Sequence, residues 1–210
     1  NCSAVVLDIV ALPALDHDAV AGDMARLPIL QPPETGESVD GFALDALLSD
    51  GRYTRLFRAV DTASGQSVAI KFPKPALLSE GGARLAFSRE MLVGARITSP
   101  FVGAAIAVAP ERQTRLYGVQ PFYVGQTLEQ RLKRPIPLEE GISIAARLAR
   151  GIAALHRLDI IHRDIKPDNV MLLSDGGLKL IDLGVARLPR VDEFAESEIP
   201  GTPSYLAPEM

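Results

Sequence analysis

The sequence predicts an α+β fold with two unequal lobes, the first rich in strands and the second helical. Between residues 53 and 124, strand-like segments surround a single helical segment, whereas a longer amphipathic helix covers residues 138–157. The chain has 210 residues, about one and a half average domains, with 47% apolar and 23% charged residues. This composition is that of an ordinary globular protein and excludes wholesale disorder.

The strands of the first lobe are predicted at residues 53–61 and 66–72, with a turn at 62–65 between them. In the second of these strands, side chains alternate, so that Ala69 and Lys71 share one face. A helix is predicted over 83–97. The apolar stretches 101–109 and 116–124 are predicted to form the next hairpin.

The helix predicted at 138–157 carries one apolar stripe, made of Ile144, Leu148, Ile152 and Leu155. Short strands are expected after it, around residue 160 and at 170–173 and 178–181, with a turn at 174–177.

Charge and cysteine content exclude several classes of function. The formal charge is −4 and the isoelectric point is about 5.4, so nothing favours nucleic acid or an anionic membrane. The single cysteine, Cys2, excludes an internal disulfide framework and suits a reducing compartment. The longest apolar run, 101–110, is too short to span a bilayer. We therefore expect a cytoplasmic location, with any membrane tether lying in a segment outside this sequence.

Four motifs stand in a characteristic order. Their sequences are VAIK at 68–71, HRDIKPDN at 162–169, DLG at 182–184 and APE at 207–209. Together they resemble the motifs of the eukaryotic-type (Hanks-type) protein kinases, a family that includes bacterial Ser/Thr kinases. The resemblance extends from about residue 42 to residue 210.

The resemblance implies a protein-kinase-like fold with a β-rich small lobe and a truncated helical large lobe. It implies a Ser/Thr protein kinase that transfers the γ-phosphoryl group of ATP, with Mg²⁺, to a hydroxyl of a protein substrate. Neither the substrate nor the activating signal can be read from the sequence.

Phosphoryl transfer requires charge neutralisation and positioning. By resemblance, Lys71 reaches the α- and β-phosphates and Glu90 holds Lys71 in place, unless Glu90 is only a solvated charge on its helix. Asp164 orients the substrate hydroxyl, and Lys166 neutralises the γ-phosphate. Asn169 and Asp182 are the predicted Mg²⁺ ligands, because this ion prefers oxygen donors.

The adenine site is predicted from the segment that links the lobes. The carbonyl of Pro121 and the amide of Tyr123 are the expected partners of the adenine edge, with Gln120 at the gatekeeper position. Ala69 is expected to line the same site. Met171 is expected to pack beneath the ring, or simply in the core.

Two features favour a Ser/Thr kinase over a tyrosine kinase. Lys166 follows the HRD triplet, and the hydroxyl of Thr202 is expected to bond Asp164 and Lys166. By resemblance, Arg163 is the receptor for a phosphate on the acidic loop 185–200. Ser197 of that loop is a candidate autophosphorylation site; alternatively, the carboxylates substitute for a phosphate on Arg163, or the loop is solvated and mobile.

Three positions depart from the family pattern. The glycine-rich loop maps onto residues 49–56, where only Gly51 is retained and Asp50 brings a negative charge toward the phosphates. Leu183 replaces the usual phenylalanine. Gly94 replaces a bulky apolar residue, and we expect it to leave a hole that loosens the helix.

The two ends of the sequence suggest a longer parent protein. Residues 1–10 resemble the last strand of a PPM-type metal-dependent phosphatase, or are any buried strand. We therefore predict a remnant of a preceding phosphatase-like domain at 1–25, a linker at 26–40, and a kinase domain at 41–210 that lacks the C-terminal part of its large lobe.

Two alternatives to an active kinase remain open. One is a pseudokinase-like nucleotide-binding regulatory module, favoured by the altered glycine loop and by Gly94. The other is an inactive fragment of a bifunctional phosphatase/kinase, in which an open large lobe exposes apolar surface and misplaces Asp164.

Overall fold

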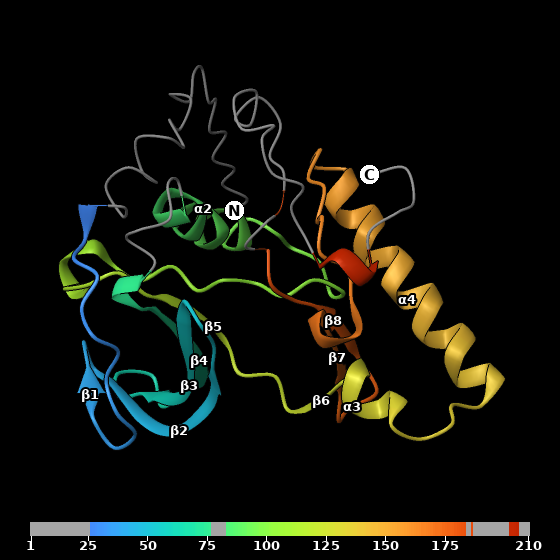
Figure 1. Ribbon diagram of the computed structural model, residues 1–210, viewed down its shortest axis with the longest axis horizontal. Coiled ribbons are helices and arrows are strands. Elements are labelled where there is room, and N and C mark those ends of the chain that lie inside the picture. Colours follow the sequence, from blue (N-terminus) through green and yellow to red (C-terminus); the bar gives the residue numbers. More distant parts are fainter. Residues whose placement is uncertain (1–25, 77–82, 184–185, 187–201, 206–210) are drawn as a thin grey trace, which may run out of the picture.

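The computed structural model describes residues 26–76, 83–183, 186 and 202–205, which form two lobes (Figure 1). The strand expected within residues 1–10 and the phosphatase-like remnant predicted at 1–25 lie outside the described residues. In the part of the chain that is described, no helix is long and apolar enough to cross a membrane.

The small lobe is built on a five-stranded antiparallel sheet with the strand order β1-β2-β3-β4-β5. Its strands are β1 (Ser38–Val39), β2 (Phe42–Asp50), β3 (Thr54–Asp61), β4 (Ser67–Pro73) and β5 (Gly118–Pro121). The helix α2 (Ala83–Gly94) belongs to the same lobe and lies above the sheet in the view of Figure 1. The alternation predicted for β4 is confirmed, since Val68, Ile70 and Phe72 are buried in the sheet core.

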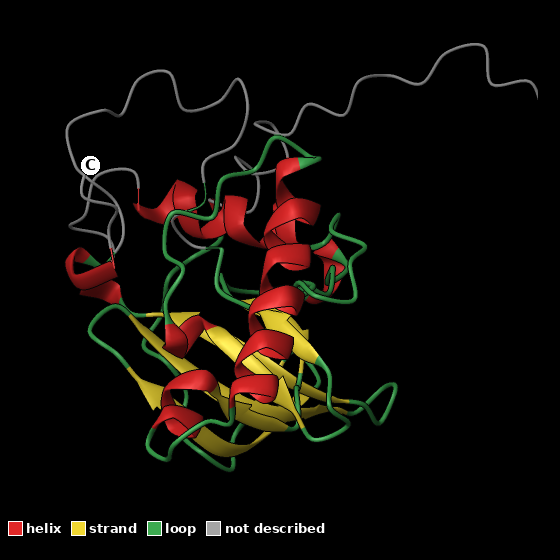
Figure 2. Ribbon diagram, turned by 90° about the vertical axis from the view of Figure 1, so that its right-hand side faces the viewer, coloured by secondary structure: helices red, strands yellow, loops and turns green. Residues whose placement is uncertain are grey.

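The large lobe combines helices with a second, three-stranded sheet of order β6-β7-β8. Its elements are β6 (Gly125–Thr127), α3 (Leu128–Leu132), α4 (Leu138–His156), β7 (Val170–Leu173) and β8 (Leu178–Leu180). Two short 3-10 helices of the large lobe are η3 (Pro167–Asn169) and η4 (Pro203–Tyr205), whereas η2 (Pro110–Arg112) is held to the small lobe by bonds from Arg112 to Asp40 and Asp61. When α4 faces the viewer, it stands in front of the strands (Figure 2).

The predicted helix at 138–157 is confirmed as α4. Its apolar stripe packs as expected: Ile144 and Leu155 are buried in the large-lobe core, and Leu148 and Ile152 pack against that core. Leu183 is buried in the same core, so leucine is accommodated at this position.

Three predicted elements differ in the structure. Residues 101–109 do not form a strand of a hairpin; their link to β5 is the single bridge Ile106–Val119. The helix α2 ends at Gly94, three residues before the predicted end. No named strand forms around residue 160 in the described chain, where Ile160 instead contributes a buried side chain.

The expected hole at Gly94 is not present. Gly94 is buried, and a Cβ atom added to it would lie 2.9 Å from Cβ of Ala105 and 3.2 Å from the Ala105 nitrogen. The irregular segment 101–109 therefore approaches α2 closely, and Ala105 occupies the space beside Gly94.

The segment predicted as a linker, 26–40, packs against the small lobe. Ser38 and Val39 pair with β2, and Ile29 is buried beside Phe87 and Leu116. The division of the chain into domains remains a prediction, but residues 27–39 are integrated into the small lobe.

Candidate active site

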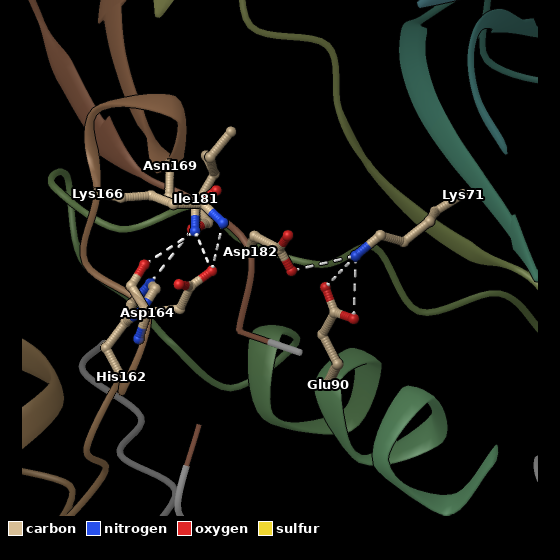
Figure 3. A network of polar contacts seen from close by, with 8 residues as sticks. All are labelled: Lys71, Glu90, His162, Asp164, Lys166, Asn169, Ile181 and Asp182. Carbon is tan, nitrogen blue, oxygen red and sulfur yellow. Dashed lines mark hydrogen bonds and ion pairs between the residues drawn. The ribbon is translucent and has the colours of Figure 1, made fainter. Parts of the chain in front are cut away.

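The first polar cluster joins three segments that are far apart in the sequence: β4, α2 and the stretch after β8 (Figure 3). Lys71 Nζ lies 2.9 and 3.2 Å from the two carboxylate oxygens of Glu90. The same ammonium donates to Asp182 Oδ1 at 3.2 Å. The Lys71–Glu90 contact expected from the sequence is therefore present.

Burial and charge set the protonation of this cluster. The side chain of Glu90 is only 9% exposed, which contradicts the alternative of a solvated helix charge. Burial raises the pKa of Glu90 to about 6, and nearby Asp182 adds to this, although Lys71 opposes it. Burial alone would lower the pKa of Lys71, but the charges of Glu90 and Asp182 outweigh it and raise that pKa above its ordinary value.

Glycine lets α2 approach the sheet closely. Any Cβ at Gly118 of β5 would overlap Sδ of Met91, so this thioether packs directly on the strand backbone. Met91 follows Glu90 in α2, and the close approach therefore helps to set the distance between Glu90 and Lys71.

The second polar cluster surrounds Asp164. Its Oδ1 accepts a hydrogen bond from the Thr202 hydroxyl at 2.7 Å, and its Oδ2 accepts from Asn169 Nδ2 at 2.9 Å. Lys166 Nζ lies 2.9 Å from Oδ2 and donates to Thr202 Oγ1 at 2.8 Å. The two contacts predicted for Thr202 are thus confirmed.

These partners keep Asp164 ionised. Partial burial would raise the pKa of the carboxyl, but hydrogen bonds from Lys166, Thr202 and Asn169 outweigh it and lower that pKa below its usual value. A carboxylate of this kind is a weak base but a well-oriented hydrogen-bond acceptor.

His162 orients the loop, a role that the sequence analysis did not assign. The imidazole is 2% exposed, and burial lowers its pKa, so the ring is neutral near pH 7. Its Nδ1 accepts from the Asp164 amide at 3.3 Å, which leaves Nε2–H to donate to the Ile181 carbonyl at 3.2 Å. The HRD triplet at 162–164 contained this signal, because its histidine stands two residues before Asp164.

The backbone is strained at two positions of the site. Arg163 and Asp182 have φ values of 64° and 65°, in the left-handed region that non-glycine residues rarely adopt. Arg163 directly precedes Asp164, and Asp182 itself belongs to the first cluster. The fold therefore holds the backbone in an unfavourable conformation where the polar side chains converge.

Asp182 directly follows Ile181, and the Ile181 amide donates to the Asn169 carbonyl at 2.9 Å. This backbone hydrogen bond links the segments that carry the two predicted metal ligands, Asn169 and Asp182. Among the described residues, no three His, Cys, Asp or Glu side chains form a group that could hold a metal ion. One carboxylate and one amide oxygen suit Mg²⁺, which usually completes its coordination with substrate phosphates and water.

The predicted adenine-binding residues lie where the two lobes are joined. Ala69 is buried and pairs with Gln120 across β4 and β5. Pro121 ends β5, and Met171 pairs with Thr127 in the second sheet. The Tyr123 hydroxyl accepts from the Ala104 amide at 3.1 Å, which anchors the connection between the lobes.

The charge of Asp50 is balanced. Its carboxylate lies 2.5 Å from Lys74 Nζ and 3.2 Å from Arg55 Nε, and these cations lower its pKa. Lys74 Nζ also donates to the Gly51 carbonyl at 2.6 Å. The expected negative charge at the glycine loop is therefore paired with cations at the base of the loop.

Of the remaining predicted positions, Ser197, Gly184 and Glu209 lie outside the described residues.

Comparisons with known proteins agree with this geometry. Residues 42–210 match the protein kinase domain family. The probable serine/threonine-protein kinase PknB of Corynebacterium glutamicum is 30% identical over 182 residues, covering 81% of this chain and 28% of that protein. PknK, a serine/threonine-protein kinase of Mycobacterium tuberculosis, is 31% identical over 163 residues, covering 76% of this chain and 14% of that protein. CBL-interacting protein kinase 4 of rice (Oryza sativa) is 31% identical over 183 residues, covering 83% of this chain and 40% of that protein.

The chain belongs to the protein kinase family, and these relatives are named as protein kinases, two of them of the serine/threonine type. It spans less than half the length of each of the three. Members of this family use ATP and Mg²⁺.

Proposed function

We propose that this chain carries the catalytic region of a Ser/Thr protein kinase, with Mg²⁺–ATP as phosphoryl donor and a protein hydroxyl as acceptor. The observation that carries the proposal is the Asp164 carboxylate. Lys166, Asn169 and Thr202 hold it, beside a second cluster in which Lys71 is paired with Glu90.

In this proposal, Lys71 binds the α- and β-phosphates, and Glu90 holds the ammonium in reach of them. Asn169 and Asp182 would hold Mg²⁺, which would neutralise negative charge on the bound nucleotide. Gly51 offers its backbone to the phosphates. The adenine ring is placed between Ala69 and Met171, with its edge toward the Pro121 carbonyl and the Tyr123 amide.

Asp164 accepts a hydrogen bond from the substrate hydroxyl and orients its oxygen toward the γ-phosphorus. As the new O–P bond forms, the bond from phosphorus to the β,γ-bridging oxygen breaks, ADP leaves and the hydroxyl proton passes to Asp164. Lys166 neutralises the γ-phosphoryl oxygens during transfer. The lowered pKa of Asp164 suits a group that orients the hydroxyl and receives its proton only late in the reaction.

The acceptor is proposed to be serine or threonine. The support is the Lys166–Thr202 hydrogen bond of 2.8 Å, which joins the catalytic loop to the segment where substrate is expected. Ser197 remains a predicted autophosphorylation site, and the phosphatase-like interpretation of residues 1–10 and the cytoplasmic location likewise remain predictions from sequence.

The two alternatives are less well supported. A pseudokinase is disfavoured by the paired Lys71 and by the ordered Asp164. The inactive-fragment alternative expects exposed apolar surface, and α4 does expose Leu138 (79%) and Ile142 (60%). The contacts of Asp164 with Lys166, Asn169 and Thr202 speak against this alternative.

Intact-mass spectrometry after incubation with Mg²⁺–ATP and a generic protein acceptor tests the proposal. With the unaltered chain, we expect mass gains that each correspond to one phosphate, and fragmentation should locate these phosphates on Ser or Thr. With Asp164→Asn, we expect no mass gain. Equal gains in both proteins would contradict the assigned role of Asp164. No gain in either, together with no Mg²⁺–ADP binding, would contradict the proposed function.

A further inference from the structure

A short segment ahead of the sheet lies against α2. We call residues 27–31 the strap. Ile29 of the strap is buried with Phe87 of α2 and Leu116, which precedes β5. These three side chains form a core cluster that is separate from the main cores of the two lobes.

Backbone carbonyls of the strap accept hydrogen bonds from both sides. The Leu116 amide donates to the Pro28 carbonyl at 3.0 Å, and the Arg115 guanidinium donates to the Gln31 carbonyl at 2.5 Å. From α2, Arg84 donates to the Leu27 carbonyl. The strap therefore ties the first turns of α2 to the chain that enters β5.

The glycine loop reaches the same cluster. Tyr53, two residues after Gly51, packs against the cluster together with Leu27, and the Tyr53 carbonyl accepts from the Lys74 amide at 2.7 Å. The cluster around Ile29 thus touches two parts of the small lobe that the proposed function assigns to nucleotide binding, the helix carrying Glu90 and the loop carrying Gly51.

We propose that the strap is a positioning element for the nucleotide site, a proposal that rests on the proposed kinase function. Met91 and Gly94 anchor the second half of α2 against Gly118 and Ala105, whereas the strap holds the first half through Arg84 and Phe87. Phe87 is three residues from Glu90, about one helical turn, so a shift of Phe87 moves Glu90 relative to Lys71. Displacement of the strap therefore weakens nucleotide binding without any change in a residue that touches the nucleotide.

Hydrogen exchange in the full chain tests the contact itself. Ile29→Ala is compared with Ile144→Ala, because both isoleucines are 9% exposed and each belongs to a core cluster. We expect Ile29→Ala to speed amide exchange in α2 and at residues 51–53 by about 10-fold or more, while α4 is unchanged. Ile144→Ala is expected to affect α4 and spare α2. Unchanged exchange in α2 of Ile29→Ala would overturn the proposal.

A double-mutant cycle on Mg²⁺–ADP affinity tests whether Ile29 acts through Glu90. We expect Ile29→Ala and Glu90→Gln each to weaken binding by about 10-fold, and the double variant to bind no more weakly than Glu90→Gln alone. Ile29→Val is expected to restore affinity to within about twofold. Additive losses, about 100-fold in the double variant, would reduce the strap to a stabilising contact and overturn the positioning role. If the unaltered chain binds no Mg²⁺–ADP, the kinase proposal fails, and hydrogen exchange still decides whether the strap holds α2.

Discussion

The two polar clusters of the site are assembled in different ways. The Asp164 cluster is mostly local, because Asp164, Lys166 and Asn169 lie within one short loop and only Thr202 comes from elsewhere. The Lys71 cluster is entirely long-range, since Lys71, Glu90 and Asp182 come from a strand, a helix and the stretch after β8.

This difference separates two requirements of catalysis. A local loop holds its geometry wherever the large lobe is folded, whereas the long-range cluster exists only when α2 is docked on the sheet. Chemistry is therefore expected to depend on the first cluster, and nucleotide binding and its control on the second.

Within the long-range cluster, Asp182→Asn is expected to have the largest effect on transfer, because Asp182 contacts Lys71 and is also a proposed Mg²⁺ ligand. We predict about a 10²–10³-fold loss of phosphoryl transfer, measured by initial rates with Mg²⁺–ATP. Asp45→Asn is the matched control, since Asp45 forms an exposed ion pair with Arg58 and its loss should change little. Comparable rates in Asp182→Asn and the unaltered chain would remove Asp182 from the site.

The pH dependence of the long-range cluster follows from the pKa of Glu90, which is raised from 4.5 to about 6. Folding therefore favours the protonated carboxyl. Its contribution to the free energy of unfolding is fully present below about pH 4.5 and is lost as the pH rises through about 6. The contact with Lys71 requires the carboxylate, so Mg²⁺–ADP affinity should change in the opposite sense and weaken as the pH falls through about 6.

Titration calorimetry and chemical unfolding between about pH 5 and about pH 7.5 measure these two trends. Glu90→Gln should flatten both of them. An affinity that still falls with pH in Glu90→Gln would assign the transition to another group.

Thr202→Ala tests the one long-range member of the Asp164 cluster. Loss of the hydroxyl removes a hydrogen bond to the Asp164 carboxylate and one from Lys166, and we predict about a 10-fold slower transfer with unchanged Mg²⁺–ADP affinity. Thr202→Ser keeps the hydroxyl and should retain most of the rate. If serine is as slow as alanine, packing of the methyl group and not the hydroxyl is responsible.

Gly94→Leu gives the smallest expected effect, on stability. Because a Cβ atom already meets Ala105 at 2.9 Å, overpacking should lower the free energy of unfolding by about 1–3 kcal/mol. Gly141→Ala in α4 is the control: its Cβ would have 3.9 Å of space to Ile136, and helix propensity predicts a gain of about 0.5–1 kcal/mol. Stabilisation by Gly94→Leu would mean that a hole exists after all.

The sequence predicted the local cluster better than the elements around it. The motif HRDIKPDN placed Asp164, Lys166 and Asn169 together because a short loop leaves few alternatives, and β4 and α4 followed from their apolar periodicity. Lys71 and Glu90 were paired by resemblance and by helix position, and Glu90 lies well within α2 although the helix ends earlier than predicted.

The misses concern tertiary packing. The division of the chain at residues 26–40 remains a prediction, but composition did not reveal the burial of Ile29, which depends on Phe87 and Leu116, residues distant in sequence. The prediction of a hole at Gly94 did not include the close approach of Ala105. The prediction of a negative charge near the phosphates did not include Lys74 and Arg55, which pair with Asp50. Arg55 pairs with Asp50 across the hairpin and was within reach of a local argument, whereas no local pattern signals the contacts of Ile29, Gly94 or Lys74.

Mg²⁺–ADP binding measured by calorimetry in three versions of this chain tests the division between the clusters most directly. We predict that Asp164→Asn binds as tightly as the unaltered chain, within about twofold, whereas Lys71→Met binds at least about 10-fold more weakly, a difference of about 1.4 kcal/mol. Equal affinity in Lys71→Met and the unaltered chain, or a loss in Asp164→Asn as large as that in Lys71→Met, would contradict the account.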